Sequence, residues 1–569
     1  MQRTDRLHEQ IARTALATYA ALPAHGKPRR RSNRAPEWTV LAAVCLCCPA
    51  DDGYDVRCVS LGTGLRALPH ARLPIHGDVL HDSHAEVIAR RGFKLWLYGE
   101  IARVLQREAG GAQVDTNLLV ERVGSREWRL IEGCKVGMYI STLPCGDAST
   151  YFLSLSAPPP GAGQSPSSSV EPVTQQTPEA CRGPPMAELH PSLAIAASLG
   201  MHTLHDSAPP AVVPSPSSTP AAHSAVVHRG RAAYSALSIL RTKPGRADSS
   251  PTTSHSCSDK LALWALLGLQ GGLLAQLGVR RVPLECVVVA GGFAHWDDER
   301  RERIRSECTR ALGGRLEQWA REVGLDEAEF RTPDVAFAEH EFDGAREVVA
   351  RREGVAVGEV LGCAESLSYV AGACPPVEVL TNGIRQGASP KRKPGQALGL
   401  KIRSRLSKLS LFQTHLDVLS PSAASNSNTS PADPSPSQDS AASAPRPSSP
   451  LAGNAPPSTY FTAKHPSPLP LPLPLPLALP LSLSLPLSTA AGAAALAPGP
   501  GARYALVKHL ARAPRAPFAG WLVSGREWEG FDVEGRVVVV SSGRERILLA
   551  PPPLPLPLPL ALGTEGLRS

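Results

Sequence analysis

Proline at alternate positions in one stretch of this chain limits what the chain can fold into. Residues 470–487 read PLPLPLPLALPLSLSLPL, which is apolar enough to suggest a membrane span. Proline lacks a backbone donor and clashes with the preceding helical turn, and hydrocarbon does not tolerate the carbonyls that stay unpaired. A flexible polyproline-like spacer is therefore expected, and residues 551–563 repeat the pattern. The sequence predicts no transmembrane segment.

Long segments rich in proline, serine and alanine interrupt the rest of the chain. They lie near residues 157–227 and 420–457, which contain few large apolar side chains, and near 466–500, which includes the Pro-Leu run described above. Burial there cannot offset the entropy of ordering the backbone, so these segments are expected to be disordered insertions. With 56 prolines and 48 glycines in 569 residues and only 5% aromatic residues, one large domain with such insertions is expected rather than several domains.

The expected organisation has three parts. They are a basic N-terminal segment at 1–36, a domain at 37–532 that the insertions interrupt, and a Pro-Leu-rich tail at 533–569. The net charge is +8, and the first segment contains a run of cations, namely Lys27, Arg29, Arg30, Arg31 and Arg34. Such a run is more often a solvated tail or an import signal than a binding site, although it also attracts phosphates.

The start of the chain and its cysteines indicate the compartment. The first ten residues, MQRTDRLHEQ, are charged where a secretory signal peptide needs an apolar run. Twelve cysteines occur at irregular spacings, which does not suggest a disulfide framework. A reducing compartment, cytoplasm and/or nucleus, is expected, with thiols that are free or bound to metal.

Between the insertions, strand-like and helix-like patterns alternate. Apolar runs predict strands over 37–47, 56–64, 136–141 and 284–290, and helical periodicity predicts helices over about 83–105 and 259–277. Strands that alternate with helices predict an α/β layered fold.

Three short turns carry side chains that suit a metal ion. His84 stands where the first helix begins, Cys145 stands at the strand-to-helix turn after residues 136–141, and Cys257 precedes the second helix. A helix N-terminus lowers the pKa of a thiol through its dipole, so cysteine there is a good thiolate donor. One imidazole and two thiolates leave a tetrahedral zinc ion one open position for water, as in catalytic sites.

Glu86 lies two residues beyond His84 in the first helical turn, where its carboxylate would face that water instead of the metal. This is the chemistry of nucleobase deaminases, in which the activated water attacks the ring carbon that carries the amine and the glutamate moves the protons. Taken singly, HAE is a helix cap, PCG is a turn and a buried cysteine is inert packing. The three together, each at an expected helix start, favour the zinc interpretation.

The spacing of the cysteines narrows the comparison with known deaminases. Cytidine-type enzymes carry PCxxC, whereas here the next cysteine of this kind after Cys145 is Cys257. In this separation and in its motifs the chain resembles the adenosine deaminases acting on RNA. The shared motifs are DSHAEVIARR, TLPCGDAS, RTKPGR, SCSDKLALW and GLQGGLL.

The tRNA-specific branch of that family, which acts on the adenosine 3′ of the anticodon, fits better than the other branches. The motifs that favour it are HGKP before EWTVLAAV, VSLGTG, KPGR ahead of SCSDK, NGIRQGASPKRK and KIRSRLSKLSLF.

The resemblance implies a fold and a reaction. The fold is an α/β deaminase-type mixed β-sheet flanked by helices, with the disordered insertions at its surface. His84, Cys145 and Cys257 would hold zinc, and Glu86 would be the catalytic proton shuttle. The reaction would be hydrolytic deamination of adenosine to inosine in tRNA, next to the anticodon of tRNA-Ala, on a base that is flipped or already looped out.

The resemblance also implies a second cofactor, because similar enzymes bury an inositol hexakisphosphate in the core. Many cations must surround such a polyanion. Asp82 and Lys243, with Lys260, resemble the polar chain that links the phosphate to the zinc side. The residues that resemble the phosphate-binding positions are Arg90, Arg91, Lys260, Lys408, Tyr460, Lys464, Tyr504, Lys508 and Trp521. Taken singly, each lysine or arginine could equally be an exposed charge.

Contacts to the RNA are expected at a few further positions. Gly64 and Arg66 resemble a substrate-side loop, although GTG can also be a plain turn. Arg246 and residues 391–393 could meet phosphates, and linker charges would look the same.

Three other functions fit the sequence less well than tRNA deamination. An editor of double-stranded RNA carries binding modules upstream, whereas only 36 residues precede EWTVLAAV here. An editor of other structured RNA remains an alternative, as does an inactive zinc-containing RNA- or phosphate-binding protein. Glu86 speaks against the inactive protein, since a structural zinc site has no use for a carboxylate at an open position. The expected partner is tRNA, with neither a membrane nor DNA, and the oligomeric state stays open.

Overall fold

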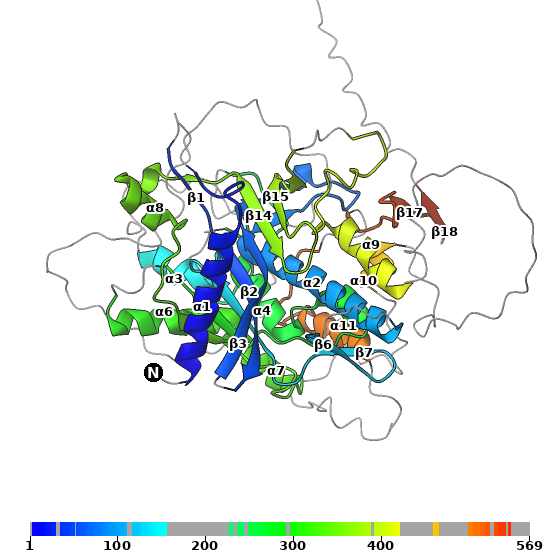
Figure 1. The fold of residues 1–569 in the computed structure, drawn as a ribbon, viewed down its shortest axis with the longest axis horizontal. Coiled ribbons are helices and arrows are strands. Elements are labelled where there is room, and N and C mark those ends of the chain that lie inside the picture. The colour runs from blue at the N-terminus through cyan, green and yellow to red at the C-terminus, as the bar shows by residue number, and fades with distance from the viewer. Residues whose placement is uncertain are drawn as a thin grey trace, which may run out of the picture.

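The computed structural model describes most of the chain outside the low-complexity segments (Figure 1). Apart from residues at their edges, the insertions near 157–227, 420–457 and 466–500 and the end of the 533–569 tail lie outside the described residues. The described ranges are 3–29, 35–51, 53–110, 117–155, 227–230, 236–243, 249–291, 296–387, 392–420, 459–465, 499–523, 528–541 and 544–547.

Helices and strands alternate through the described residues. The α-helices are α1 (Arg3–Ala21), α2 (Ala85–Glu108), α3 (Asp147–Leu155), α4 (Cys257–Leu267), α5 (Gly271–Gln276), α6 (Asp298–Leu312), α7 (Glu317–Glu322), α8 (Arg346–Glu353), α9 (Lys408–Leu419), α10 (Tyr460–Lys464) and α11 (Pro500–Ala511), with 3₁₀ turns η1 (His70–Arg72), η4 (Gly314–Leu316) and η5 (Val357–Glu359). The strands are β1 (Glu37–Trp38), β2 (Leu41–Ala50), β3 (Gly53–Thr63), β4 (Leu65–Ala67), β5 (Asp82–His84), β6 (Val120–Val123), β7 (Glu127–Leu130), β8 (Lys135–Ile140), β9 (His228–Arg229), β10 (Arg241–Thr242), β11 (Cys286–Val289), β12 (Asp334–Phe337), β13 (Leu361–Gly362), β14 (Glu365–Val370), β15 (Val377–Thr381), β16 (Ile384–Arg385), β17 (Val538–Ser541) and β18 (Arg544–Ile547).

An eight-stranded mixed sheet forms the centre of the fold (Figure 1). Its strand order is β12-β11-β8-β2-β3-β14-β15-β16. The neighbours β12, β11 and β8 run parallel, and every pair from β8 to β16 is antiparallel. The expectation of an α/β fold with a mixed sheet flanked by helices is confirmed.

Alternate residues of β2 face opposite layers, because successive side chains of a strand point to opposite sides of a sheet. Helix α2 covers one side and helix α1 covers the other. The apolar cluster on the α2 side includes Ala42, Val44, Leu46, Ile88 and Phe93, and the cluster on the α1 side includes Leu41, Ala43, Cys45, Ile11 and Ala12. The near-continuous apolar run of β2 therefore reflects burial on both faces.

Helix α1 was not expected from the sequence, which indicated a separate basic segment at 1–36. Its residues Leu7, Ile11, Ala12 and Ala15 are buried against the sheet, so this helix belongs to the same body as residues 37 onward. Residues 30–34 of the basic run lie outside the described residues.

The helix expected over 259–277 is two helices, α4 and α5. Gly268 ends α4 with φ of 84°, and Gly271 begins α5 with φ of 71°. Residues other than glycine rarely adopt such backbone angles, and the chain turns between these two positions. The turn brings α5 against α10 and α11, and not along the axis of α4.

One cysteine pair corrects the expectation that all thiols are free or bound to metal. Cys48 at the end of β2 and Cys134 just before β8 form a disulfide, with their Cα atoms 4.2 Å apart. The register of β2 and β8, which pairs Cys47 with Lys135, places the two cysteines opposite each other. Among the residues that the structure describes, no helix has the length and apolar character needed to cross a membrane.

Candidate metal centre and active site

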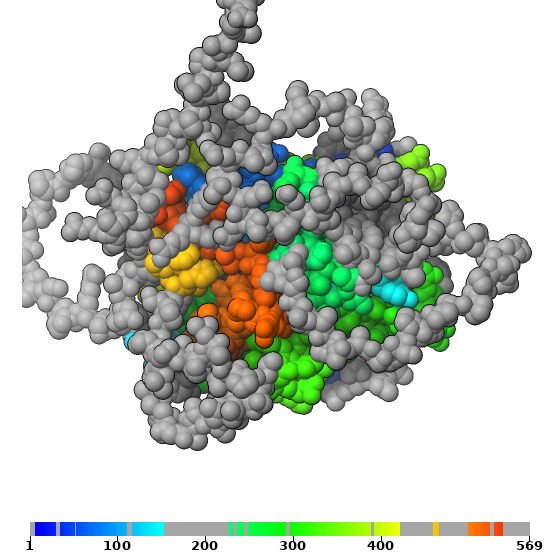
Figure 2. Space-filling model, turned by 180° about the vertical axis from the view of Figure 1, so that it is seen from behind, coloured from blue at the N-terminus to red at the C-terminus, as the bar shows by residue number. Residues whose placement is uncertain are grey.

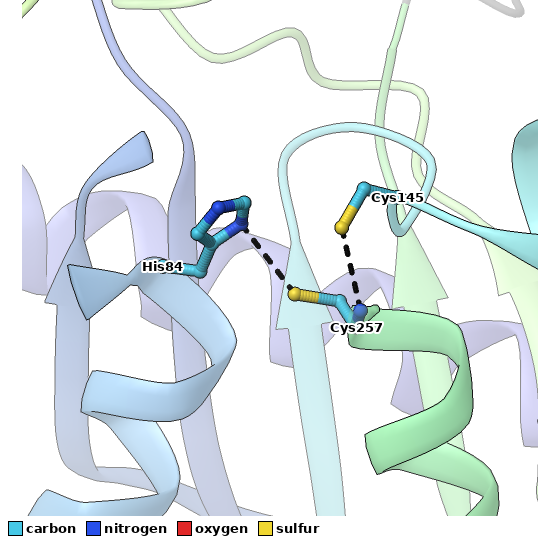
Figure 3. Close-up of side chains that lie close together, drawn as sticks. All are labelled: His84, Cys145 and Cys257. Carbon is cyan, nitrogen blue, oxygen red and sulfur yellow. Dashed lines mark hydrogen bonds between the residues drawn. The ribbon is translucent and has the colours of Figure 1, made fainter. Parts of the chain in front are cut away.

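The starts of helices α2 and α4 and the turn that follows β8 meet at one place (Figure 3). His84 ends β5 and is the N-cap residue of α2. Cys145 follows β8 and stands two residues before α3, and Cys257 is the first residue of α4. All three predicted ligands therefore lie at helix starts, where the backbone dipole favours an anionic thiolate.

The ligand atoms of these residues form one cluster. Among the described residues, the nitrogen of His84 and the two sulfur atoms all lie within 4.8 Å of one another. Nδ1 of His84 is 3.6 Å from Sγ of Cys257, and the backbone N–H of Cys257 donates to Sγ of Cys145 at 3.3 Å (Figure 3). An imidazole and two thiolates within this distance could hold a metal ion, as the sequence predicted.

Local sequence keeps the two cysteine turns together. Gly146 has φ of 101°, and a Cβ atom there would lie 2.2 Å from Oγ of Ser256, so only glycine fits. Ser256 caps α4 by accepting from the backbone N–H of Asp259. The hydroxyl of Ser258 accepts from the N–H of Ala148 at 3.1 Å, which joins the start of α4 to the start of α3.

Glu86 lies in the first turn of α2 and is only 3% exposed. Its Oε2 atom has no hydrogen-bond partner among the described residues. Burial raises the pKa of Glu86, and the charges of His84, Cys145 and Lys243 are near enough to act on it. A buried carboxylate oxygen without a hydrogen bond is costly, so this atom points to chemistry beyond packing.

A chain of buried charges connects the cluster with the interior. Nζ of Lys243 lies 3.2 Å from Sγ of Cys257 and 2.8 Å from Oδ2 of Asp82. Asp82 also accepts from Lys260, so the predicted chain of these three polar residues is present. Burial works against the charge of Asp82, but Lys243 and Lys260 outweigh it and hold its pKa well below the usual value.

The charge of Lys243 also acts on the thiols. Burial opposes its ammonium, but Asp82 and the two cysteines outweigh burial and raise the pKa of this lysine. The pKa of Cys145 lies well below its ordinary value, chiefly because Cys257 donates a hydrogen bond to it and also because Lys243 is close. The surroundings thus favour a thiolate at Cys145, whereas burial and Cys145 raise the pKa of Cys257 and Lys243 only partly counteracts them.

A second group of charges lies beyond Lys260, and we call it the cationic cluster. Its residues come from α2, α9, α10 and α11 and from the residue after α11. The Tyr-x3-Lys repeats on α10 and α11 both approach Gly272 of α5. Figure 2 shows α10 and α11, in yellow-orange and orange, on the face opposite to that of Figure 1. The cluster consists of Arg90, Arg91, Lys94, Lys408, Lys464, Lys508 and Arg512.

Burial, together with like charges, lowers the pKa of two lysines of this cluster. Burial, with Lys464 and Arg512, lowers the pKa of Lys508 to about 7. Burial also lowers the pKa of Lys408 to about 8, even though Glu529 counteracts it. Glu529 bonds Lys464 and lies 3.1 Å from Lys408, so it compensates part of the positive charge.

Sequence reasoning missed three members of this site: Lys94, Arg512 and Glu529. Lys94 follows Arg90 by four positions and Arg512 follows Lys508 by four, so each lies one helical turn from a predicted residue. That spacing could have revealed them. Glu529 has no such signal, because only the fold brings it to Lys464.

The aromatic residues predicted for this site surround it. The Lys464 ammonium is 5.5 Å from the ring centre of Tyr460, and that of Lys508 is 6.0 Å from the ring centre of Tyr504. Arg512 lies 5.2 Å from the ring of Trp521, which stacks on His255 beside Cys257.

Of the residues predicted to contact RNA, the structure describes some and leaves others outside the described residues. Gly64 has φ of 144°, and a Cβ atom there would lie 2.1 Å from the carbonyl of Ser83, so glycine is required by the β4–β5 hairpin itself. Arg66 is exposed on β4, opposite Ser83. Arg246 and Lys391 lie outside the described residues.

Comparison with known proteins agrees with this geometry. The model of the adenosine-deaminase (editase) domain family matches residues 60–442, which include His84, Glu86, Cys145 and Cys257. The mouse protein named tRNA-specific adenosine deaminase 1 is 30% identical over 472 residues, and the match covers 72% of this chain and 88% of the mouse protein.

Two further relatives match this chain over shorter lengths. The Saccharomyces cerevisiae tRNA-specific adenosine deaminase 1 is 28% identical over 290 residues, covering 51% of this chain and 60% of the yeast protein. The mouse double-stranded RNA-specific adenosine deaminase is 31% identical over 150 residues, covering only 26% of this chain and 12% of that protein. The family match over two thirds of the chain and the mouse relative together show that this chain belongs to the adenosine-deaminase (editase) domain family.

Proposed function

We propose that this protein is a zinc-dependent enzyme that deaminates adenosine to inosine in tRNA by hydrolysis, at the adenosine 3′ of the anticodon of tRNA-Ala. The observation that carries the proposal is the cluster of His84, Cys145 and Cys257 together with the buried carboxylate of Glu86, whose Oε2 atom has no hydrogen-bond partner among the described residues. The tRNA substrate is supported by the mouse and yeast relatives, whose names say that they act on tRNA.

Zinc fits the donor set, since two thiolates and one imidazole are soft ligands that leave one of four positions open. When bound, zinc supplies Lewis acidity that activates a water molecule for attack on a carbon atom. The side chains that would hold it are His84, Cys145 and Cys257. Lys243 helps to keep Cys257 ready for this role, because its ammonium stabilises a thiolate.

Glu86 moves the protons of the reaction. Its carboxylate accepts a proton from the attacking water and delivers it to the adenine ring, and a second transfer reaches the leaving amine. A C–O bond forms at the ring carbon, the C–N bond breaks and ammonia leaves. The raised pKa of Glu86 suits this role, because a general acid and base works best when its pKa approaches the working pH.

The cationic cluster fits inositol hexakisphosphate. Seven buried or half-buried cations face one compensating carboxylate, Glu529, among the members described above. Unpaired buried charges cost several kcal/mol each, roughly, so a polyanion is needed to neutralise them. The chain from Lys260 through Asp82 to Lys243 connects this ligand with the metal cluster.

We further propose that Arg66, which is exposed on β4 opposite Ser83, meets a phosphate of the RNA backbone. The target base must leave its stack to reach Glu86, which a looped-out anticodon-region nucleotide does at low cost.

One experiment tests the function directly. The purified protein is incubated with total tRNA, and inosines are mapped by sequencing, because inosine is read as guanosine. Conversion of the adenosine 3′ of the tRNA-Ala anticodon is expected. Conversion of adenosines in double-stranded RNA but not in tRNA would contradict the proposal, and tRNA from cells that lack the protein serves as an unmodified substrate.

A further inference from the structure

Each of the two cysteines is followed two residues later by a fully buried aspartate. Asp147 follows Cys145 and begins α3, and Asp259 follows Cys257 in the first turn of α4. Both aspartates are 0% exposed. Buried carboxylates need compensating partners, so the groups that bind them also fix the turns that carry the cysteines.

Arg315 in η4 lies between these two carboxylates. Its Nη2 atom donates to Oδ1 of Asp259 at 2.8 Å, and its Nη1 atom lies 3.7 Å from Oδ2 of Asp147. The Arg315 side chain is only 4% exposed. One guanidinium therefore reaches both helix starts from outside the two turns.

The two aspartates differ in how much they depend on Arg315. Asp147 is also bound by Arg310, whose Nη1 is 2.7 Å from Oδ2, and by the backbone N–H of Ser238. Asp259 accepts from the hydroxyl of Ser256 and the N–H of Arg241, which are neutral groups. Arg315 is the cation that forms an ion pair with Asp259 in the described part of the chain.

We infer that Arg315 is a positioning residue for the metal centre: it holds the helix starts of Cys145 and Cys257 at the separation that lets both sulfur atoms bind one ion. The inference rests on the proposed zinc function. Hydrogen bonds of Ser258 already join the backbones of the two turns. Arg315 joins the same two helix starts at other atoms, through the side chains of Asp147 and Asp259, and a second link limits rotation of each helix start about the first.

A partner that orients a ligand without touching the metal still affects metal binding, and its loss usually costs roughly 10-fold to 100-fold in affinity or activity. Arg315→Met removes the charge, the hydrogen bond to Asp259 and the longer ion contact with Asp147, while keeping the bulk of an unbranched side chain. Arg315→Lys keeps the charge but cannot reach both carboxylates with a fork. Arg281→Met is a matched control, since Arg281 is a largely buried arginine that bonds the carbonyls of Ala265 and Leu266 at the other end of α4.

The experiment measures zinc release from the purified full-length proteins to a coloured chelator, and the visible spectrum after replacement of zinc by cobalt(II). Arg315→Met is expected to release zinc about 10-fold faster than wild type or more, with an altered sulfur-to-cobalt band, and Arg315→Lys to be intermediate. Arg281→Met should match wild type in both measurements.

The outcomes separate this inference from the proposed function. If wild-type protein holds no zinc, the proposed function fails. If wild type holds zinc and Arg315→Met releases it at the wild-type rate, or if Arg281→Met loses it equally fast, the inference alone is overturned. If Arg315→Met does not fold, Arg315→Lys decides by the same two measurements, and a wild-type rate and spectrum for it would overturn the inference.

Discussion

The ammonium of Lys243 lies 3.2 Å from the sulfur of Cys257, and the same ammonium bonds Asp82. A single buried lysine therefore touches both the metal cluster and the charged chain that leads to the cationic cluster. Its charge favours the thiolate form of the nearby sulfur.

The first prediction concerns this lysine. Lys243→Met should lower the rate of adenosine deamination about 10-fold to 100-fold, because the Cys257 thiolate loses its neighbouring cation and Asp82 loses one of two partners. Initial rates on tRNA measure the effect. Lys135→Met, at an exposed position on β8, is the control and should keep the wild-type rate. Equal rates for wild type and Lys243→Met would show that this contact has no role.

The second prediction concerns the metal. Wild-type protein should contain one zinc ion per chain, and Cys257→Ala should contain almost none, because two ligands cannot hold the ion in this geometry. Elemental analysis of dialysed protein measures both. Cys308→Ala removes another buried free cysteine, on α6, and should keep its zinc. Full zinc content in Cys257→Ala would exclude this residue as a ligand.

How far the sequence predicted the fold depends on whether the signal was local. The strand expected over 136–141 is β8, and the helix expected over 83–105 is α2, because their apolar patterns are strong and uninterrupted. The break between α4 and α5 was missed because it depends on two glycines adopting positive φ, which composition alone does not reveal. Helix α1 was missed although Leu7, Ile11 and Ala15 recur every four residues, as on one face of a helix, because the prediction treated residues 1–36 as a basic segment.

The candidate site was predictable for the same reason. His84, Cys145 and Cys257 each stand in a short motif at a helix start, so local sequence marked them before any fold was known. Glu529 and Arg315 have no motif, since they reach their partners only through long-range packing. Local motifs and the family resemblance indicated the candidate ligands and the chain of Asp82, Lys243 and Lys260, but not Glu529 or Arg315.

The third prediction concerns the polyanion. Protein made in cells that lack inositol hexakisphosphate should be mostly insoluble, because the cationic cluster is then short of compensating charge. Soluble yield with and without the ligand measures this. Lys508→Met removes one of the repelling charges, so it should raise the ligand-free yield and weaken the response to added ligand. Wild-type protein with the same yield from both kinds of cell would contradict a buried polyanion site.

The fourth prediction concerns pH. Burial lowers the pKa of Lys508 to about 7 and that of Lys408 to about 8, whereas a lysine of the unfolded chain titrates near 10.4 by ordinary values. Without polyanion, the unfolded chain therefore binds more protons in this window, and stability rises as the pH increases from about 7 to about 9. The soluble fraction after refolding in polyanion-free buffer should increase accordingly.

Added inositol hexakisphosphate should remove this dependence, because a bound polyanion keeps the lysines charged. Refolding yields that stay level between about pH 7 and about pH 9 in polyanion-free buffer would show that these lysines keep an ordinary pKa in the folded protein, and would contradict the prediction.

The fifth prediction concerns Glu86. Glu86→Gln keeps the size of the side chain, and the affected oxygen has no partner to lose, so the fold and zinc content should stay as in wild type. The rate should fall by about 100-fold or more, because the amide cannot accept and return a proton. Glu121→Gln, at a half-exposed position on β6, is the matched control and should be fully active.

The most direct test of the whole account is deamination of tRNA in water labelled with heavy oxygen, using zinc-loaded wild type and Glu86→Gln and detecting nucleosides by mass spectrometry. For wild type, the account predicts inosine next to the anticodon that carries the heavy oxygen, and for the variant it predicts unchanged adenosine. Inosine without the label, or labelled inosine formed equally fast by Glu86→Gln, would contradict hydrolysis directed by this site.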